Sequence, residues 1–353
     1  MKKHNFGAGP GILPDTVLQQ AAAAVLNFNN TGLSILEISH RSKEFEAVME
    51  HARSLVRELL NVPEGYEILF LHGGASTQFA MVPWNLLKTK AGYIETGVWA
   101  NKAIKEAKML GEVKVLASSA DKNFSYIPKG YEIPSDIDYL HITSNNTIYG
   151  SEMHAFPECP VPLVCDMSSD IFSRPVDVSK FGLIYAGAQK NMGPAGATLV
   201  IVKKELLGKT GRKISSMLDY QVHIDGESMY NTPPAYAVYV CMLTLEWLKS
   251  LGGVSAIDKL NQEKADYFYN ALDRMPAFKG TIAKEDRSRM NACFLLNDSS
   301  KEEAFLQKAK EAGIVGIKGH RLSGGFRASL YNALPLESVK VLVGIMDDFA
   351  KES

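Results

Sequence analysis

The chain has 353 residues, more than one ordinary hydrophobic core needs, so about two domains are expected. Its formal net charge of −1 supplies no basic field for nucleic acid or an anionic membrane, and we expect neither as a partner. A hydrophobic fraction of 46% is typical of a soluble globular protein, and no apolar run approaches the roughly 18 residues of a membrane span.

The N-terminal region predicts neither a signal peptide nor a dinucleotide loop. Pro10 and Pro14 interrupt the segment after Lys2 and Lys3, so no signal-peptide core exists. The run "GAGPG" (7–11) has only a few residues before it and contains a proline, which excludes a dinucleotide-binding turn. The cysteines are scattered without a CxxC pair or metal-ligand spacing, which indicates a reduced, cytoplasmic protein without a metal site.

From about residue 15 to 205 helical periods alternate with short apolar strands. Residues 42–60 open on a capping Ser42 and place apolar side chains at helical spacing. Strands are predicted at 67–71, 92–96, 113–118, 138–143, 162–167, 182–188 and 198–202. Runs that are apolar on both faces favour an α/β fold with a mostly parallel, seven-stranded sheet covered by helices. Ligands of such sheets bind beyond the carboxyl ends of the strands.

The last third of the chain has a different pattern of predicted helices and strands. Residues 235–274 predict one or two long helices, broken near Gly252 and Gly253. Beyond about residue 276 the order is strand, helix, strand pair and final helix, which indicates a smaller α+β domain. We therefore predict an N-terminal segment (1–14) near the small domain, a large domain (15–250) and a small domain (251–353).

A lysine and an aspartate end two of the predicted strands. Lys190 follows "GLIYAGAQ" among small residues, and desolvated lysine amines form Schiff bases. Asp166 ends the preceding apolar run, and side chains at two strand ends can face one crevice. Pyridoxal phosphate needs this pair, a lysine for its aldehyde and an acid for its ring nitrogen. The alternatives are a solvated strand end and a turn cap.

Three further features fit such a cofactor. The turn "GG" (73–74) followed by Ser76 and Thr77 at a helix start offers amides and hydroxyls to a phosphate, or is simply a turn with a cap. Trp99 follows a glycine turn and either stacks on the ring or packs in the core. Arg321 and Arg327 lie close enough in sequence to bind two ends of a small dianion, or are surface charges.

Short motifs occur in one order along the chain: "HRSKEF" (40–45), "GGASTQF" (73–79), "TGVWA" (96–100), "CDMSS" (165–169), "GAQKNMGPAG" (187–196), "NTPP" (231–234) and "GHRLSGGFRASLYNA" (319–333). Together they closely resemble the phosphoserine aminotransferase family, a class V branch of the fold-type I pyridoxal-phosphate enzymes. The resemblance runs from "GAGPGILP" near the start to "ASLYNAL" near the end, so it covers essentially the whole chain.

The resemblance implies pyridoxal 5′-phosphate as cofactor and a role for each matching residue. Lys190 is implied to form the Schiff base, Asp166 to pair with the ring nitrogen and Trp99 to stack on the ring. Further cofactor contacts are implied for Ala75, Ser76 and Gln189 at the phosphate, Thr147 at the phenolic oxygen, and Asn231 and Thr232 from the second subunit. Substrate contacts are implied for Arg327 at the α-carboxylate and for His40, Arg41, His320 and Arg321 at the distal phosphate or carboxylate.

The family's members are homodimers with active sites at the interface, and the implied reaction is ping-pong transamination. L-Glutamate and 3-phosphohydroxypyruvate give 2-oxoglutarate and O-phospho-L-serine, a step of serine biosynthesis. Many bacterial members also act on 4-phosphohydroxy-L-threonine in vitamin B6 biosynthesis, which the sequence does not decide. Some relatives carry an arginine in the phosphate loop where this chain has Ser76 and Thr77, so amides and hydroxyls must meet the phosphate charge.

Two alternatives predict other features. A cysteine desulfurase of the same class needs a loop cysteine beside the cofactor, whereas the cysteines here look buried in strands or helices. A regulator that holds the cofactor without catalysis carries a fused DNA-binding module, usually with a basic patch. The enzyme-like pattern takes up the whole chain and the net charge is near zero, so both alternatives are disfavoured.

Overall fold

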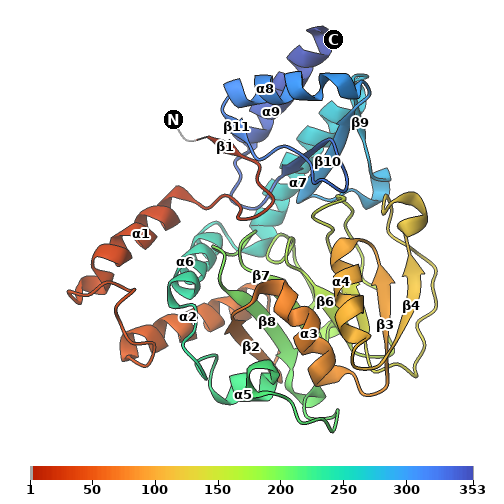
Figure 1. The fold of residues 1–353 in the computed structure, drawn as a ribbon. Coiled ribbons are helices and arrows are strands. Elements are labelled where there is room, and N and C mark those ends of the chain that lie inside the picture. Colours follow the sequence, from red (N-terminus) through yellow and green to blue (C-terminus); the bar gives the residue numbers. More distant parts are fainter. Residues whose placement is uncertain (1–2, 353) are drawn as a thin grey trace.

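The computed structural model describes residues 3–352 and consists of a large sheet with helices on both faces and a smaller sheet beside it (Figure 1). The strands are β1 (His4–Asn5), β2 (Tyr66–Leu71), β3 (Lys90–Glu95), β4 (Glu112–Ser118), β5 (Leu140–Thr143), β6 (Leu163–Asp166), β7 (Leu183–Gly187), β8 (Thr198–Lys203), β9 (Phe278–Gly280), β10 (Asn291–Leu296), β11 (Ile314–Val315) and β12 (Phe326–Ser329). The α-helices are α1 (Asp15–Leu26), α2 (Lys43–Leu59), α3 (Gly74–Leu86), α4 (Val98–Ala107), α5 (Tyr220–Asp225), α6 (Ala235–Ser250), α7 (Val254–Arg274), α8 (Glu302–Glu311) and α9 (Leu336–Glu352).

The large sheet has seven strands in the order β2-β8-β7-β6-β5-β3-β4. All neighbours pair in parallel except β8, which runs against both β7 and β2. The predicted fold class, a mostly parallel seven-stranded sheet, is therefore confirmed. Because β5, β6 and β7 point the same way, Thr143, Asp166 and Gly187 end at one edge of the sheet.

Helices cover both faces, which explains why the central strands are apolar throughout. Along β6, Leu163 and Cys165 face the cluster that holds α2 and α6, while Val164 faces the cluster that holds α3 and α4. This alternation is the period of two that a strand imposes on its side chains. Ser42 begins α2 as predicted, and its hydroxyl accepts a hydrogen bond from the amide of Phe45.

The smaller sheet has the order β12-β10-β9, antiparallel throughout, and packs with α7, α8 and α9 around a phenylalanine-rich core. The N-terminal segment joins it, because β1 pairs in parallel with β11 and Phe6 is buried in the same core. Figure 1 shows the described start of the chain beside β11. The predicted strand pair near the C-terminus is only partly formed, since its two runs meet at one bridge, Lys318 with Phe326.

Two strands, β1 and β9, were not expected from the sequence, because each has only two or three residues and too short a pattern to read. The predicted break near Gly252 and Gly253 is confirmed as the gap between α6 and α7. The domain boundaries after residues 14 and 250 stay predictions. Within residues 3–352 no single helix is long and apolar enough to span a membrane; α6 and α7 pass that test only as a pair bent by 84°.

Candidate active site

A cavity of about 470 Å³ lies at the carboxyl ends of β5, β6 and β7, where the small sheet approaches the large one. This is the edge at which parallel sheets bind ligands. The predicted site residues that line it are Ala75, Ser76, Trp99, Thr147, Asp166, Gln189, Lys190, His320 and Arg327. Residues that lie far apart in the sequence are thus brought to one place by the strand order.

Lys190 enters the cavity from the loop that follows β7. Its Nζ donates a hydrogen bond to Thr147 Oγ1 at 2.7 Å and lies 6.0 Å from the centroid of the Trp99 ring. Desolvation lowers the pKa of Lys190 to about 8, although the Asp166 carboxylate opposes the shift and Arg327 adds to it. A lysine with this pKa has a substantial neutral fraction near neutral pH, which a nucleophilic or proton-accepting amine requires.

Asp166 ends β6 and is almost fully buried. Its Oδ1 accepts a hydrogen bond from the amide of Ser168 at 2.9 Å. Burial raises the pKa of this carboxyl, whereas the hydrogen bond from Ser168 and the charge of Lys190 oppose the rise. Lys190 and Asp166 therefore stabilise each other's charged forms across the cavity. The two side chains line one cavity, whereas the cofactor roles assigned to them stay predictions.

The turn before α3 forms a second wall of the cavity. Gly73 and Gly74 adopt φ values of 92° and 65°, and a Cβ on Gly73 would lie 1.9 Å from Thr77 Oγ1, so only glycine fits there. The first turn of α3 thus presents Ala75 and Ser76, with the free amides of a helix start, to the cavity. The Thr77 hydroxyl, also expected there, instead donates to Gly73 O at 3.1 Å and lines a separate hollow.

Several polar atoms around the cavity are buried without a hydrogen-bond partner in the described part of the chain. They are Thr143 Oγ1, Trp99 Nε1 and Arg327 Nε. Thr143 is paired with Asp166 in the register of β5 and β6, so its hydroxyl lies beside the aspartate. Buried polar atoms are nearly always satisfied in folded proteins, and these orphaned atoms fit a bound polar group. With Lys190 and Asp166, the set fits a pyridoxal-type cofactor.

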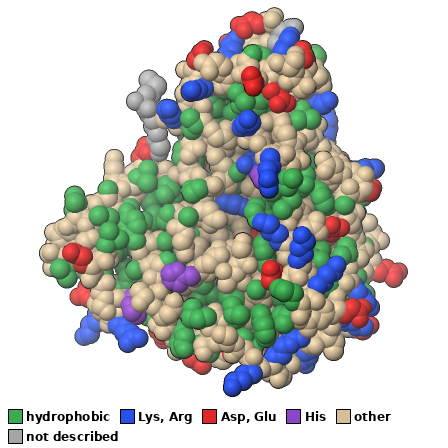
Figure 2. All heavy atoms as spheres, viewed as in Figure 1, with side chains coloured by type: hydrophobic (Ala, Val, Ile, Leu, Met, Phe, Trp, Pro, Cys, Tyr) green, Lys and Arg blue, Asp and Glu red, His purple; other side chains and the backbone are tan. Residues whose placement is uncertain are grey.

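The mouth of the cavity is positively charged. Arg327, on β12, donates from Nη1 to Thr147 O at 3.0 Å, which brings the small sheet against the Lys190 side of the cavity. Desolvation and then the charges of Arg327, Arg321 and Lys102 lower the pKa of His320. Figure 2 shows Lys and Arg side chains gathered around a His between the upper part of the molecule and the region of α4. An anionic substrate fits this field.

The remaining predicted residues do not line the cavity of this chain. Arg41 and Arg321 are exposed, and His40 is partly buried with its Nε2 unpartnered. Asn231 lines the separate hollow that Thr77 shares, and the neighbouring Thr232 carbonyl lies 2.9 Å from His72 Nε2. Their assigned roles stay predictions.

Sequence reasoning missed residues at three places. Thr143 at the end of β5 and Asn145 beyond it line the cavity, and Ser168 and Ser169 line it beyond β6. The signal was present, because the polar runs "TSNNT" and "SSD" directly follow apolar strands. Ala8 and Gly9 also line the cavity. Nothing in the sequence places that segment, because its position depends on the pairing of β1 with β11.

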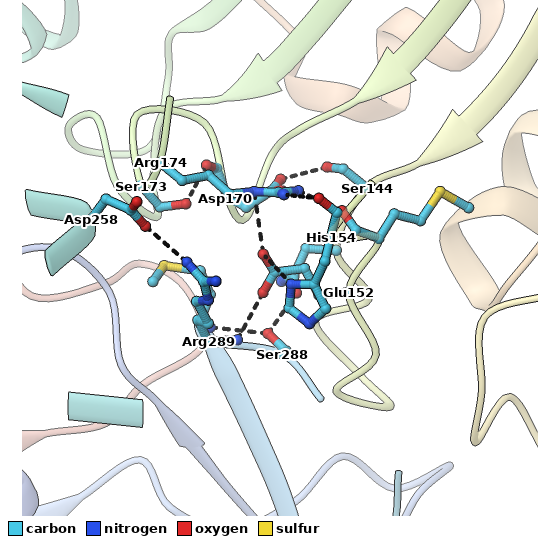
Figure 3. Close-up of polar contacts among 12 residues, drawn as sticks. Ser144, Glu152, His154, Asp170, Ser173, Arg174, Asp258, Ser288 and Arg289 are labelled. Atoms are coloured by element: carbon cyan, nitrogen blue, oxygen red, sulfur yellow. Dashed lines mark hydrogen bonds and ion pairs between the residues drawn. The ribbon is translucent and has the colours of Figure 1, made fainter. Parts of the chain in front are cut away.

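A buried ion cluster joins the loop that follows β6 to the segment around Glu152 (Figure 3). Arg174 lies between two carboxylates, with Nη2 3.4 Å from Asp170 Oδ2 and Nε 3.3 Å from Glu152 Oε1. Arg174 also donates to the carbonyls of Met153 and His154, at 2.6 and 3.0 Å. Burial raises the pKa of both carboxyls, and the guanidinium opposes the rise. The charges of Arg174, Asp170 and Glu152 therefore compensate one another within the cluster.

The ion cluster connects the two sheets. Glu152 Oε2 accepts from the amide of Arg289, just before β10, at 2.7 Å. Arg289 in turn forms an ion pair with Asp258 of α7 at 2.8 Å. The large sheet and the smaller sheet are therefore linked by buried or half-buried charges as well as by the cavity that both line.

The family pattern of "Aminotransferase class-V" matches residues 4–342. The chain belongs to the class-V aminotransferase family. The predicted family and fold class are therefore confirmed. The cavity lies where the two sheets meet, and the enzyme assignment rests on family membership together with that cavity.

Relatives of this class-V aminotransferase agree in length and fold. A phosphoserine aminotransferase from Flavobacterium psychrophilum is 62% identical over 351 residues, 99% of each chain. The solved structure of phosphoserine aminotransferase from Bacillus circulans subsp. alkalophilus has a TM-score of 0.97 at 44% identity and covers 99% of each chain. A pyridoxal-phosphate-bound phosphoserine aminotransferase from Trichomonas vaginalis has a TM-score of 0.93 at 38% identity, over 98% of this chain and 100% of that one.

Proposed function

We propose that the protein transfers the amino group of L-glutamate to 3-phosphohydroxypyruvate, giving 2-oxoglutarate and O-phospho-L-serine. The observation that carries the proposal is the convergence of Lys190, Asp166 and Trp99 on one cavity, in a chain 62% identical to a phosphoserine aminotransferase. The reaction is reversible and proceeds in two half-reactions, one for each amino acid. A second activity on 4-phosphohydroxy-L-threonine is not part of the proposal.

The proposal includes pyridoxal 5′-phosphate as the cofactor. When bound, it supplies an electron sink for the negative charge that develops at the substrate α-carbon. Asp166 would hold the proton on the ring nitrogen, Trp99 would offer a flat face to the ring, and the start of α3 with Gln189 would hold the phosphate. Lys190 would provide the amine for the cofactor's aldehyde, and its Nζ, with the pKa lowered to about 8, would accept the α-proton of the substrate. Thr147 holds that free amine in place.

Two groups of cations distinguish the ends of the substrate. Arg327, which lines the cavity, binds the α-carboxylate that every amino-acid substrate carries. A distal phosphate adds about two negative charges, and burying them without partners would cost more than binding returns. His320 lies at the cavity mouth beside Arg321, and we assign both to the distal group. His40 and Arg41 complete the phosphate site from a second copy of the chain.

The active enzyme is proposed to be a cytoplasmic homodimer. Exposed leucines gather on and after α1, at Leu18, Leu26, Leu33 and Leu36, just before His40 and Arg41. Figure 2 shows hydrophobic side chains over that part of the molecule. Burying them against a second copy would stabilise association and carry His40 and Arg41 toward the partner's cavity. Asn231 and Thr232 are proposed to reach the partner's cofactor phosphate in the same way.

Purification and one assay test the proposed function. The protein should be yellow as isolated, and borohydride reduction followed by peptide mapping should place the cofactor on the peptide that contains Lys190. Glutamate and 3-phosphohydroxypyruvate should then yield phosphoserine. A label on another lysine would overturn the site, and a labelled Lys190 without phosphoserine formation would overturn the substrate.

Complementation tests the shared site. Chains carrying Lys190→Ala, mixed with chains carrying changes at both Asn231 and Thr232, should regain activity, because each heterodimer then holds one intact site. The expected recovery is about half of the wild-type activity per heterodimer, since one of two sites is restored. Confirmed heterodimers without activity would place Asn231 and Thr232 outside the partner's site.

A further inference from the structure

Residues 330–332, which follow β12, contact both chain segments that surround Lys190. One of these segments carries the lysine and the other covers it. Leu330, Tyr331 and Asn332 are all buried and come from the C-terminal part of the chain, whereas Lys190 belongs to the large sheet. None of the three lines the cavity in the described structure, so the reaction proposed above gives them no role.

The first contact holds the segment that carries the lysine. The amide of Asn332 donates to Asn191 Oδ1 at 3.0 Å, directly beside Lys190. Asn191 uses its Nδ2 on the carbonyls of Ser169 and Ile171, at 3.3 and 3.2 Å, in the loop that follows Asp166. The buried side chain of Asn191 therefore bonds the loop that carries Lys190 both to the loop after Asp166 and to residues 330–332.

The second contact holds the segment that covers the lysine. The Tyr331 hydroxyl donates to Ala8 O at 2.7 Å, and the amide of Gly11 donates to Gln189 O at 2.7 Å. Residues 8–11 are so tightly placed that a Cβ on Gly11 would lie 2.9 Å from both Lys190 O and the Tyr331 ring. Because Ala8 also lines the cavity, the position of the Tyr331 hydroxyl sets one cavity wall.

A buried lysine fixes this short segment from behind. Lys264 Nζ, on α7, donates to the carbonyls of Leu330 and Tyr331 at 2.9 and 2.8 Å. Only 2% of Lys264 is exposed, and burial alone lowers its pKa to about 7. Burying a lysine amine is costly, and its two bonds to the carbonyls of Leu330 and Tyr331 offset part of that cost.

We propose that residues 330–332, anchored by Lys264, position Lys190 by holding the loop that carries it and the N-terminal segment that covers it. This inference rests on the proposed function for its meaning in catalysis, whereas the contacts themselves are properties of the fold. A proton-transferring amine must be placed within a fraction of an ångström of its target. Tyr331, Asn332 and Lys264 are thus positioning residues that act through Lys190.

Tyr331→Phe tests the proposal, because it removes one hydroxyl and leaves the ring in place. Tyr66→Phe is the matched control. Its hydroxyl is equally buried and donates to a backbone carbonyl, Phe181 O, at 2.6 Å, but it lies at the opposite end of the sheet from the cavity. Both variants lose a hydroxyl that donates to a backbone carbonyl, so Tyr66→Phe controls for that loss. Tyr331→Phe also removes the acceptor of a 3.2 Å bond from Asn291 Nδ2, and Lys264→Met, which leaves that bond in place, separates the two effects.

Amide hydrogen exchange of the protein as purified gives the first readout. In Tyr331→Phe, peptides spanning residues 6–12 and 187–193 should exchange about tenfold faster, because opening of both segments becomes easier. Tyr66→Phe should leave both peptides unchanged. Lys264→Met is a second variant, expected to accelerate the same two peptides through residues 330–332. Unchanged exchange in both peptides for Tyr331→Phe and Lys264→Met would overturn the proposal.

Kinetics give the second readout. Tyr331→Phe should lower kcat about tenfold while the KM for glutamate changes less than about twofold, and should move the pH midpoint of the visible absorbance. A wild-type protein without transaminase activity would overturn the proposed function, and the exchange experiment would still decide the positioning proposal. Faster exchange with an unchanged kcat and absorbance would overturn the catalytic part of the proposal.

Discussion

Two polar regions lie beyond β6, and they use similar residues in opposite ways. In the cavity, Asp166 and Lys190 share space with buried polar atoms that have no partner in the described part of the chain. In the ion cluster, Asp170 lies only four positions after Asp166, yet it is bonded to Ser144 at 2.5 Å and paired with Arg174. Charge and burial are alike in the two regions. The difference is that the charges of the ion cluster are paired within the chain, although Arg174 Nε makes only an ion contact with Glu152 and no hydrogen bond within the described residues.

The bonding of buried polar groups distinguishes a functional site from a structural one in this fold. A buried group that is fully bonded stabilises the fold and has no bonding capacity left for a ligand. A buried group with open bonding capacity lowers stability, and a ligand can recover that loss. Changes in the ion cluster should therefore affect stability, and changes in the cavity should affect turnover.

The largest effect is expected for Arg174→Met, which removes the cation shared by two buried carboxylates and leaves Glu152 with His154 at 3.7 Å. We expect the free energy of unfolding to fall by about 3–5 kcal/mol at pH 8. The loss should shrink toward pH 5, because burial raises the pKa of both carboxyls and they become neutral as the pH falls. Urea denaturation at several pH values measures it. The turnover of the folded protein should stay near wild type.

A matched exposed pair controls for the charge. Lys249 and Glu58 form an ion pair of 2.6 Å in which both side chains are about half exposed. Lys249→Met should lower the free energy of unfolding by less than about 1 kcal/mol at every pH. If Arg174→Met and Lys249→Met lowered the free energy of unfolding equally, the buried ion cluster would stabilise the fold no more than an exposed ion pair does.

Asp166→Asn should show the opposite pattern. The amide oxygen can still accept from Ser168, so stability should hardly change. Turnover should fall about 100-fold, because an amide cannot keep the cofactor's ring nitrogen protonated. Steady-state kinetics with thermal denaturation on the same samples measures both. Near-normal turnover would reduce Asp166 to a turn cap and remove the contrast with Asp170.

A smaller effect should separate Arg321, which is exposed, from Arg327, which lines the cavity. Arg321→Ala should slow the phosphoserine half-reaction about ten- to hundredfold and leave the glutamate half-reaction nearly unchanged, because only phosphoserine carries a distal phosphate. Arg327→Ala should slow both, since Arg327 lines the cavity where any α-carboxylate must lie. Stopped-flow measurement of each half-reaction distinguishes them. Equal losses in Arg321→Ala would remove Arg321 from the phosphate site.

The smallest effect concerns the pH dependence of cofactor uptake. Only the neutral amine of Lys190 attacks an aldehyde, and its pKa is lowered to about 8. Uptake by the cofactor-free protein should therefore rise about tenfold per pH unit below pH 8 and level off above it. In Asp166→Asn the midpoint should fall further, because the carboxylate that favours the ammonium is gone. A midpoint near that of an ordinary lysine would mean that the amine is solvated.

Much of this architecture was predictable because a buried strand appears in the sequence as a short run of apolar residues. The runs that became β6 and β7 are apolar at every position and end on Asp166 and shortly before Lys190, so the strands and the two site residues could be predicted together. The register of β5 against β6, which places Thr143 beside Asp166, is a long-range pairing that no local pattern encodes.

The sequence also does not predict which polar side chains find a hydrogen-bond or ion-pair partner within the chain. Asp166 and Asp170 look alike in "CDMSSD", and only the approach of Arg174 and Ser144 in space separates them. Thr77 was expected to face the phosphate with Ser76, but a side chain at a helix start can bond back to the preceding turn, as it does to Gly73. Such local competition is decided by geometry.

The pairing of β1 with β11 has a consequence for the order in which the molecule is made. Residues 4–5 leave the ribosome about 310 residues before their partners at 314–315, and the Tyr331 hydroxyl follows later still. The large sheet can form while synthesis continues, since domains fold as their residues become available. Its cavity, however, gains Arg327 and the wall at Ala8 and Gly9 only after residues 314–331 have emerged. A chain interrupted before residue 314 can therefore form the large sheet without completing the cavity.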